Sequence, residues 1–137
     1  MANSQDILDA LYLFSHTEEG RTLSVSQFIT DVVNPITVGN GVFYKENGKP
    51  LGFTTWCWLN DHEVDKFKDG SLTISVEMYK RRIGDQMWGI WLLAPFGHFK
   101  QVWRQMKDRC HGAYGDTKVH WIRLRNTNSE LTHKGRM

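Results

Sequence analysis

The sequence predicts one domain of the α/β (α+β) class, in which helices flank a mixed, mostly antiparallel central sheet. Three patterns indicate this fold. Apolar residues recur at helical spacing within residues 1–35. Asn47-Gly48 separates two strand-like segments, as in a hairpin turn. The nearly unbroken apolar run 86–94 is typical of a strand buried on both faces, and an amphipathic helix pattern follows it.

Two helices are expected near the N-terminus. The first is capped by Ser4 and ends in the segment 16–20, where Gly20 suits a C-terminal stop. The second begins near Ser24 and is closed by Pro35, because proline cannot donate the next helical hydrogen bond. Their apolar residues recur three and four positions apart: Ile7, Leu8, Leu11 and Phe14, then Val25, Phe28, Ile29, Val32 and Val33.

The middle of the chain predicts strands joined by polar segments. Residues 41–58 form the hairpin. Residues 59–70 are polar and acidic, which indicates a loop with one helical turn. In residues 72–79 apolar and polar residues alternate, which favours a further strand over a short helix. Gly84-Asp85 then predicts a turn before the buried strand.

After the buried strand, Pro95-Phe96-Gly97 ends the extended segment, and we expect a helix with Phe99, Val102, Trp103 and Met106 on its apolar side. Residues 118–125 predict a last strand. The domain is therefore expected to span residues 1–125. Residues 126–137 are expected to be a polar, basic tail with too few apolar residues to fold alone.

The net charge of +2 conceals an uneven distribution. Residues 1–97 carry 8 basic and 12 acidic side chains, whereas residues 98–137 carry 9 and 3. A basic C-terminal third is compatible with a solvated helix face, and also with nucleic acid, an acidic protein or a phosphate-bearing ligand. The residues of this basic patch are Lys100, Arg104, Lys107, Lys118, Arg123 and Arg125.

Other features restrict the compartment and the chemistry. Cys57 and Cys110 show no metal-binding spacing and are too few for a disulfide scaffold, which favours a reducing, cytoplasmic compartment. The N-terminus lacks the basic and apolar regions of a signal peptide. No segment approaches the roughly 18 apolar residues of a membrane-spanning helix. We expect no metal and no bound cofactor.

One segment resembles a known family. It runs from Gly84-Asp85 through Trp88 to Ala94-Pro95-Phe96-Gly97 and resembles the signature of the RTX toxin-activating lysine acyltransferases. Tyr12 to Ser15, Arg21, Val25 to Phe28, Asn34 to Ile36 and Trp56 are similar to further family segments in the same order, so the resemblance covers residues 10–107. It implies a fold related to the GCN5-type N-acetyltransferases. It also implies transfer of a fatty acyl group from acyl carrier protein to a protoxin lysine.

The resemblance places the catalytic pair of the family at Gly20 and Trp91. The family histidine directly precedes the position of Arg21, and the family aspartate lies three residues before Ala94. Acyl transfer to lysine needs a base that takes a proton and a partner that orients the base. Glycine and tryptophan do neither, so the pair is absent. His16 and His98 are the candidate substitutes.

Further residues are candidates for binding. In related folds the junction between strand and helix meets the phosphopantetheine arm of the acyl donor, where helical N–H groups can hold phosphate. The resemblance therefore implies a binding role for Trp88, Trp91, Pro95, Phe96, Gly97 and His98. Four tryptophans lie on two candidate strands: Trp56, Trp58, Trp88 and Trp91. Core packing is the simplest interpretation of them, and a remnant acyl-binding groove or a protein interface is the alternative.

The first functional hypothesis is a non-catalytic family member that acts as a binding or structural component. Tailed bacteriophages encode short members of the family, so the resemblance implies a virion or ejection component, or a factor that binds a host protein in the host cytoplasm. A working acyltransferase is an alternative, with acyl carrier protein or acyl-coenzyme A as its donor. The second alternative is a nucleic-acid-associated protein that uses the basic patch.

Overall fold

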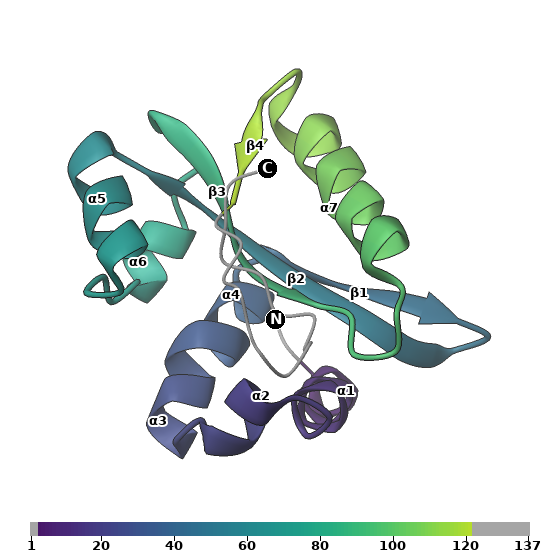
Figure 1. Ribbon diagram of the computed structural model, residues 1–137. Helices are drawn as coiled ribbons and strands as arrows, with labels where there is room; N and C mark the ends of the chain where they lie inside the picture. The colour runs from purple at the N-terminus through teal and green to yellow at the C-terminus, as the bar shows by residue number, and fades with distance from the viewer. Residues whose placement is uncertain (1–2, 122–137) are drawn as a thin grey trace.

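The computed structural model of the chain describes residues 3–121. Its centre is one four-stranded sheet in the order β1-β2-β3-β4 (Figure 1). Strands β1 (Gly41–Glu46), β2 (Lys49–Leu59) and β3 (Gln86–Leu93) pair antiparallel, and β4 (Val119–His120) pairs parallel to β3. The predicted mixed, mostly antiparallel α/β fold is confirmed. Within the predicted last strand 118–125, residues 122–125 lie outside the described residues.

Helix α1 (Ser4–Phe14) is followed by a short helix that the sequence did not predict. The cap of α1 is Asn3 rather than Ser4. Gly20 does not end α1, because it lies inside α2 (Glu18–Thr22). The Thr17 side chain begins this second helix by accepting a hydrogen bond from the N–H of Gly20 at 2.9 Å.

The second predicted helix begins after Ser24 as expected but does not end at Pro35. It consists of α3 (Val25–Phe28), the π-helical turn η1 (Ile29–Val33) and α4 (Asn34–Thr37). In η1 the N–H of Asn34 bonds to the carbonyl of Ile29, five residues back. Pro35 then falls in the first turn of α4, where a missing N–H disrupts little.

The hairpin turn is confirmed. Asn47 and Gly48 have φ angles of 53° and 77°, the left-handed conformation that this tight turn requires. Glycine adopts such angles without strain, and asparagine tolerates them better than most residues.

Two segments between β2 and β3 form helices where the sequence predicted otherwise. Helix α5 (Asp61–Asp69) replaces a loop with one turn, because Asn60 and Glu63 form a complete capping box around its first turn. The predicted strand 72–79 was wrong: its end forms the short helix α6 (Val76–Tyr79), capped by Ser75. Tyr79 is fully buried there, so packing on the core overrides the alternating pattern.

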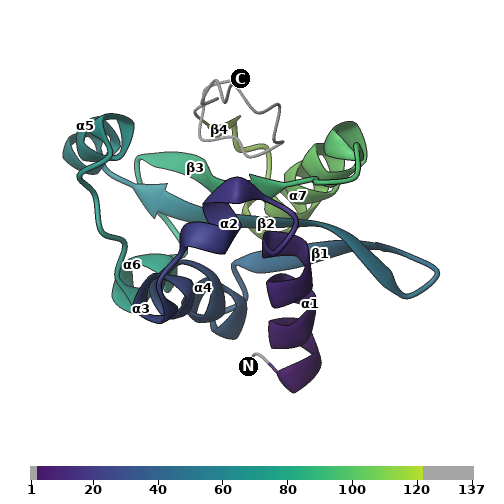
Figure 2. The same cartoon turned by 60° about the horizontal axis from the view of Figure 1, so that its bottom comes forward.

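Helices cover both faces of the sheet (Figures 1 and 2). On one face, α1 and the helices that follow it bury a large core with residues of β2 and β3. On the other face, α7 (Phe99–Tyr114) packs through Val102, Met106 and Cys110. A bulge in β3 leaves Ile90 unpaired, since Thr55 pairs with Trp91 and Trp56 pairs with Gly89.

Polar side chains link the helices to the sheet and to one another. Buried Asn40 donates to the carbonyls of Trp56 and Tyr79 at 3.0 and 2.8 Å. Arg81 forms two hydrogen bonds with the Glu63 carboxylate, at 2.6 and 3.0 Å. That contact is the main reason that the pKa of Glu63 is lowered. In residues 3–121 no helix is long and apolar enough to cross a membrane.

Candidate functional site

The turn after β3 lies beside the end of α1. The N–H of Gly97 donates to the carbonyl of Ala94 at 3.2 Å, and Gly97 has a φ angle of 95°, which favours glycine. The exposed ring of Phe96 packs edge-on against the ring of His16, with centroids 5.0 Å apart. The fold therefore brings one candidate catalytic histidine to the Ala-Pro-Phe-Gly turn.

His16 lacks the partner that a general base needs. Its exposed ring lies against the aromatic rings of Phe96 and Tyr12, the latter with centroids 4.9 Å apart. Among residues 3–121, no carboxylate forms an ion pair or hydrogen bond with it. His16 is thus close to the turn, but no carboxylate of the described residues orients its ring.

Trp91, which the resemblance aligns with the family aspartate, belongs to the hydrophobic core. Its side chain is 5% exposed and packs edge-on against Phe14, with ring centroids 5.2 Å apart. Its backbone N–H, next to the bulge, donates to the hydroxyl of Thr55 at 3.1 Å. Neither the side chain nor this N–H is available to a reacting group.

Gly20, which the resemblance aligns with the family histidine, has no room for a side chain. A Cβ atom added there would lie 2.1 Å from the carbonyl oxygen of Phe14 and 2.6 Å from the hydroxyl of Thr17. Thr17 is 1% exposed and its hydroxyl also donates to the Phe14 carbonyl at 3.1 Å. The turn between α1 and α2 therefore closes directly over position 20.

The other candidate binding residues divide between core and surface. Trp88 is buried, and its ring stacks on His120 at 5.2 Å. Pro95 and His98 are half-buried, while Phe96 and Gly97 are exposed. The Nδ1 atom of His98 is buried and has no hydrogen-bond partner among the described residues. A ligand role for these residues stays a prediction.

The basic patch is only partly described. Lys100, Arg104 and Lys107 are exposed on α7, four and three positions apart, so they share one helix face. Lys107 and Lys118 line one hollow of about 580 Å³. Arg123 and Arg125 lie outside the described residues. The binding role of this patch also stays a prediction.

No other nucleophile or metal site stands out within residues 3–121. Burial raises the pKa of the Cys57 and Cys110 thiols to about 12, so neither is a ready nucleophile. In the same residues, no three histidine, cysteine, aspartate or glutamate side chains are placed to hold a metal ion.

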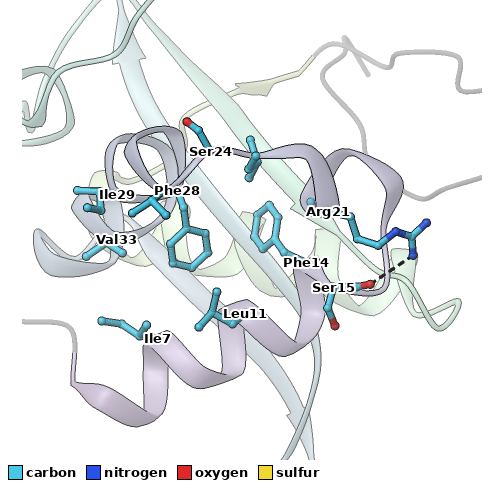
Figure 3. A pocket seen from close by; sticks show the side chains of 12 residues that line it. Ile7, Leu11, Phe14, Ser15, Arg21, Ser24, Phe28, Ile29 and Val33 are labelled. Carbon is cyan, nitrogen blue, oxygen red and sulfur yellow. Dashed lines mark hydrogen bonds between the residues drawn. The ribbon is translucent and has the colours of Figure 1, made fainter.

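An apolar groove of about 750 Å³ lies between α1 and the helices α2 and α3, and we call it the α1–α3 groove (Figure 3). Arg21 is its one charged lining residue in the described structure. Phe14, which contacts Trp91, forms part of its wall. The complete lining is Ile7, Leu11, Phe14, Ser15, Gly20, Arg21, Leu23, Ser24, Val25, Phe28, Ile29 and Val33.

Comparison with known proteins decides the family. The sequence model of the RTX toxin acyltransferase family matches residues 2–134. The chain belongs to this family. It is 24% identical over 125 residues to the lysine-acyltransferase RtxC of Vibrio cholerae, covering 90% of this chain and 80% of that protein. It is 26% identical over 102 residues to an uncharacterized protein of Synechocystis, covering 73% and 68%.

A third relative is the leukotoxin-activating lysine-acyltransferase LktC of Mannheimia haemolytica. The identity is 34% over 87 residues, which cover 63% of this chain and 48% of that protein. The chain thus matches about half the length of LktC. The family predicted from the Gly84 to Gly97 segment is confirmed.

The α1–α3 groove was not predicted from the sequence. Val25, Phe28, Ile29, Val32 and Val33 form the apolar stripe predicted for the second helix, but Val25 is 79% exposed and Ile29 is 49% exposed. Their spacing is that of an ordinary apolar helix face, so the local sequence carries no signal that part of this face stays uncovered.

Proposed function

We propose that this chain is a non-catalytic member of the RTX toxin acyltransferase family and that it acts by binding a partner protein. The surroundings of Gly20 and Trp91 carry this proposal. The first position excludes a side chain, and the second is filled by an indole in the core. Restoring a base would require a shift of backbone, and restoring an acid would require burial of a charge.

The α1–α3 groove supports the binding part of the proposal. Large exposed apolar surfaces on folded proteins usually mark interaction sites. The groove lies beside position 20, so this part of the fold keeps a concave surface although the catalytic groups are absent. A role in a tailed-phage virion or in host-protein binding is a finer prediction that comes from the family resemblance alone.

A working enzyme with a rebuilt site is the second candidate. The contact between His16 and Phe96 favours it, because it places an imidazole at the Ala-Pro-Phe-Gly turn. The absence of an orienting carboxylate among the described residues opposes it. Acyl carrier protein or acyl-coenzyme A would be its donor.

An acyl-transfer assay separates the two candidates. The full chain is incubated with palmitoyl-acyl carrier protein and, separately, with palmitoyl-coenzyme A, and donor consumption and intact masses are followed. The RtxC acyltransferase of Vibrio cholerae is the active comparison. We expect no donor turnover and no acylated product above the uncatalysed rate. Turnover that disappears in the variant His16→Ala would establish the enzyme and refute the proposal.

A further inference from the structure

The α1–α3 groove exposes apolar side chains that a folded protein normally covers. Val25 is 79% exposed, and Leu11 and Ile29 are each about half exposed. Figure 3 shows Ile7 and Val33 at one end of the groove, Leu11, Phe14 and Phe28 in the middle, and Ser15 and Arg21 at the other end. Its volume of about 750 Å³ is large enough for a row of several side chains.

Apart from Arg21 at one end, the described walls offer an occupant few hydrogen bonds. They are helices, whose backbone groups are largely bonded within the helix, so an extended peptide would find no sheet edge to join. The polar groups along the groove already have partners: the Ser15 hydroxyl donates to Tyr12, and the Ser24 hydroxyl accepts from Gln27. An occupant must therefore satisfy its own polar groups, as an α-helix does.

The one charged residue among the described lining residues gives the groove a direction. The guanidinium of Arg21, which donates to the carbonyl of Ser15 at 3.4 Å, lies at one end. The opposite end is formed by the apolar side chains of Ile7 and Val33. A helix carries partial positive charge at its N-terminus and partial negative charge at its C-terminus. The charge of Arg21 therefore fits a helix whose C-terminal end lies at this residue.

We propose that the α1–α3 groove binds one amphipathic helix of a partner protein, in an orientation parallel to α1. The inference rests on the proposed binding function and names the form of the partner. A helix of about three turns matches α1, which has 11 residues. Its apolar residues, three and four positions apart, would cover the exposed side chains of Leu11, Val25 and Ile29.

Stapled peptides test the proposal on the full chain. The probes are fluorescent amphipathic helices of about 14 residues with leucines on one face, and their binding is followed by fluorescence anisotropy. Two probes of the same composition carry one glutamate, in either the last or the first turn. We expect a dissociation constant of roughly 1–100 μM, with tighter binding of the probe whose glutamate is in the last turn. Arg21→Glu is expected to reverse that preference.

A matched pair of variants distinguishes peptide binding in the groove from non-specific hydrophobic binding elsewhere on the surface. Val25→Asp places a charge in the groove at the first position of α3, where aspartate is well tolerated by a helix. Ile83→Asp changes an equally exposed residue, 83% exposed, that does not line the groove. We expect Val25→Asp to weaken binding at least about tenfold, and Ile83→Asp to leave it unchanged within about twofold.

Several outcomes would overturn the proposal. They are no peptide binding up to about 1 mM, an equal loss in both variants, and binding of sodium laurate without binding of peptide. Concentration-dependent dimerisation that Val25→Asp abolishes, without peptide binding, would assign the groove to a second copy of the chain. The acyl-transfer assay on the same samples reports the proposed function separately, because donor turnover with intact peptide binding would refute only the non-catalytic role.

Discussion

Addition of one methyl group in the variant Gly20→Ala is expected to destabilise the protein, although Gly20 lies in a helix. The matched control is Gly112→Ala in α7. Alanine is the better helix former by about 1 kcal/mol, so propensity alone predicts stabilisation at both sites. The two positions differ in their surroundings, because a Cβ at Gly112 has no atom within 4 Å.

The magnitude follows from the distances. A Cβ at Gly20 would lie 2.1 Å from the carbonyl oxygen of Phe14, more than 1 Å short of ordinary contact at 3.4 Å. The obstacle is backbone, so α2 must move relative to α1. Overpacking costs about 1–3 kcal/mol, and the upper part of this range, about 2–3 kcal/mol, applies here because the obstacle is backbone, so the cost exceeds the gain in helix propensity. We expect a net loss of about 1–2 kcal/mol for Gly20→Ala and a gain of about 0.5–1 kcal/mol for Gly112→Ala.

Thermal unfolding by circular dichroism and urea titration measure both effects. At this chain length 1 kcal/mol corresponds to a shift in Tm of about 3–5 °C. Gly20→Ala is expected to lower Tm and Gly112→Ala to raise it. If Gly20→Ala, or Gly20→His, is as stable as the unchanged protein, position 20 accommodates a side chain and packing does not explain the missing histidine.

Three further predictions concern buried groups. Arg81→Met should lower the free energy of unfolding at pH 7 by about 1–3 kcal/mol in urea titrations, because the Glu63 carboxylate loses its partner. Arg81 lowers the pKa of Glu63, so its contribution is present at pH 7 and is lost as the pH falls below about 4.5. The loss caused by Arg81→Met should therefore shrink at pH 3, and an equal loss at both pH values would contradict this. The thiols of Cys57 and Cys110 should react with a disulfide reagent at pH 8 only after unfolding, since burial raises their pKa to about 12, and rapid native labelling would exclude such burial. Asn40→Leu should cost about 2–4 kcal/mol in the same titrations, because it removes the buried side-chain amide that donates to the carbonyls of Trp56 and Tyr79 and leaves Arg82 as the side-chain donor to Tyr79. A loss below about 0.5 kcal/mol would contradict this role.

Local chemistry made part of the fold predictable. Asn47-Gly48 defines its turn by its own backbone preferences, and Gly97 ends β3 with a positive φ angle that favours glycine. The run 86–94 is apolar on both faces and forms the buried strand β3 in residues 86–93. Features of this kind depend on a few adjacent residues, so the sequence alone indicates them.

Other features depend on residues far apart in the chain. Segment 72–79 alternates like a strand, yet its end is helical because buried Tyr79 packs against the core. The exclusion of a side chain at Gly20 depends on the position of the backbone carbonyl of Phe14. Every residue type has such a carbonyl, so its position cannot be inferred from the residue types.

By itself, the sequence determined the family and the fold class, and residue types alone show that neither Gly20 nor Trp91 carries a base or an acid. The tertiary structure decided how these two positions are packed and where the α1–α3 groove lies. The lack of room at position 20 and the groove both arise where α1 packs against α2 and α3, and such packing is set by contacts between separate segments rather than by local preference.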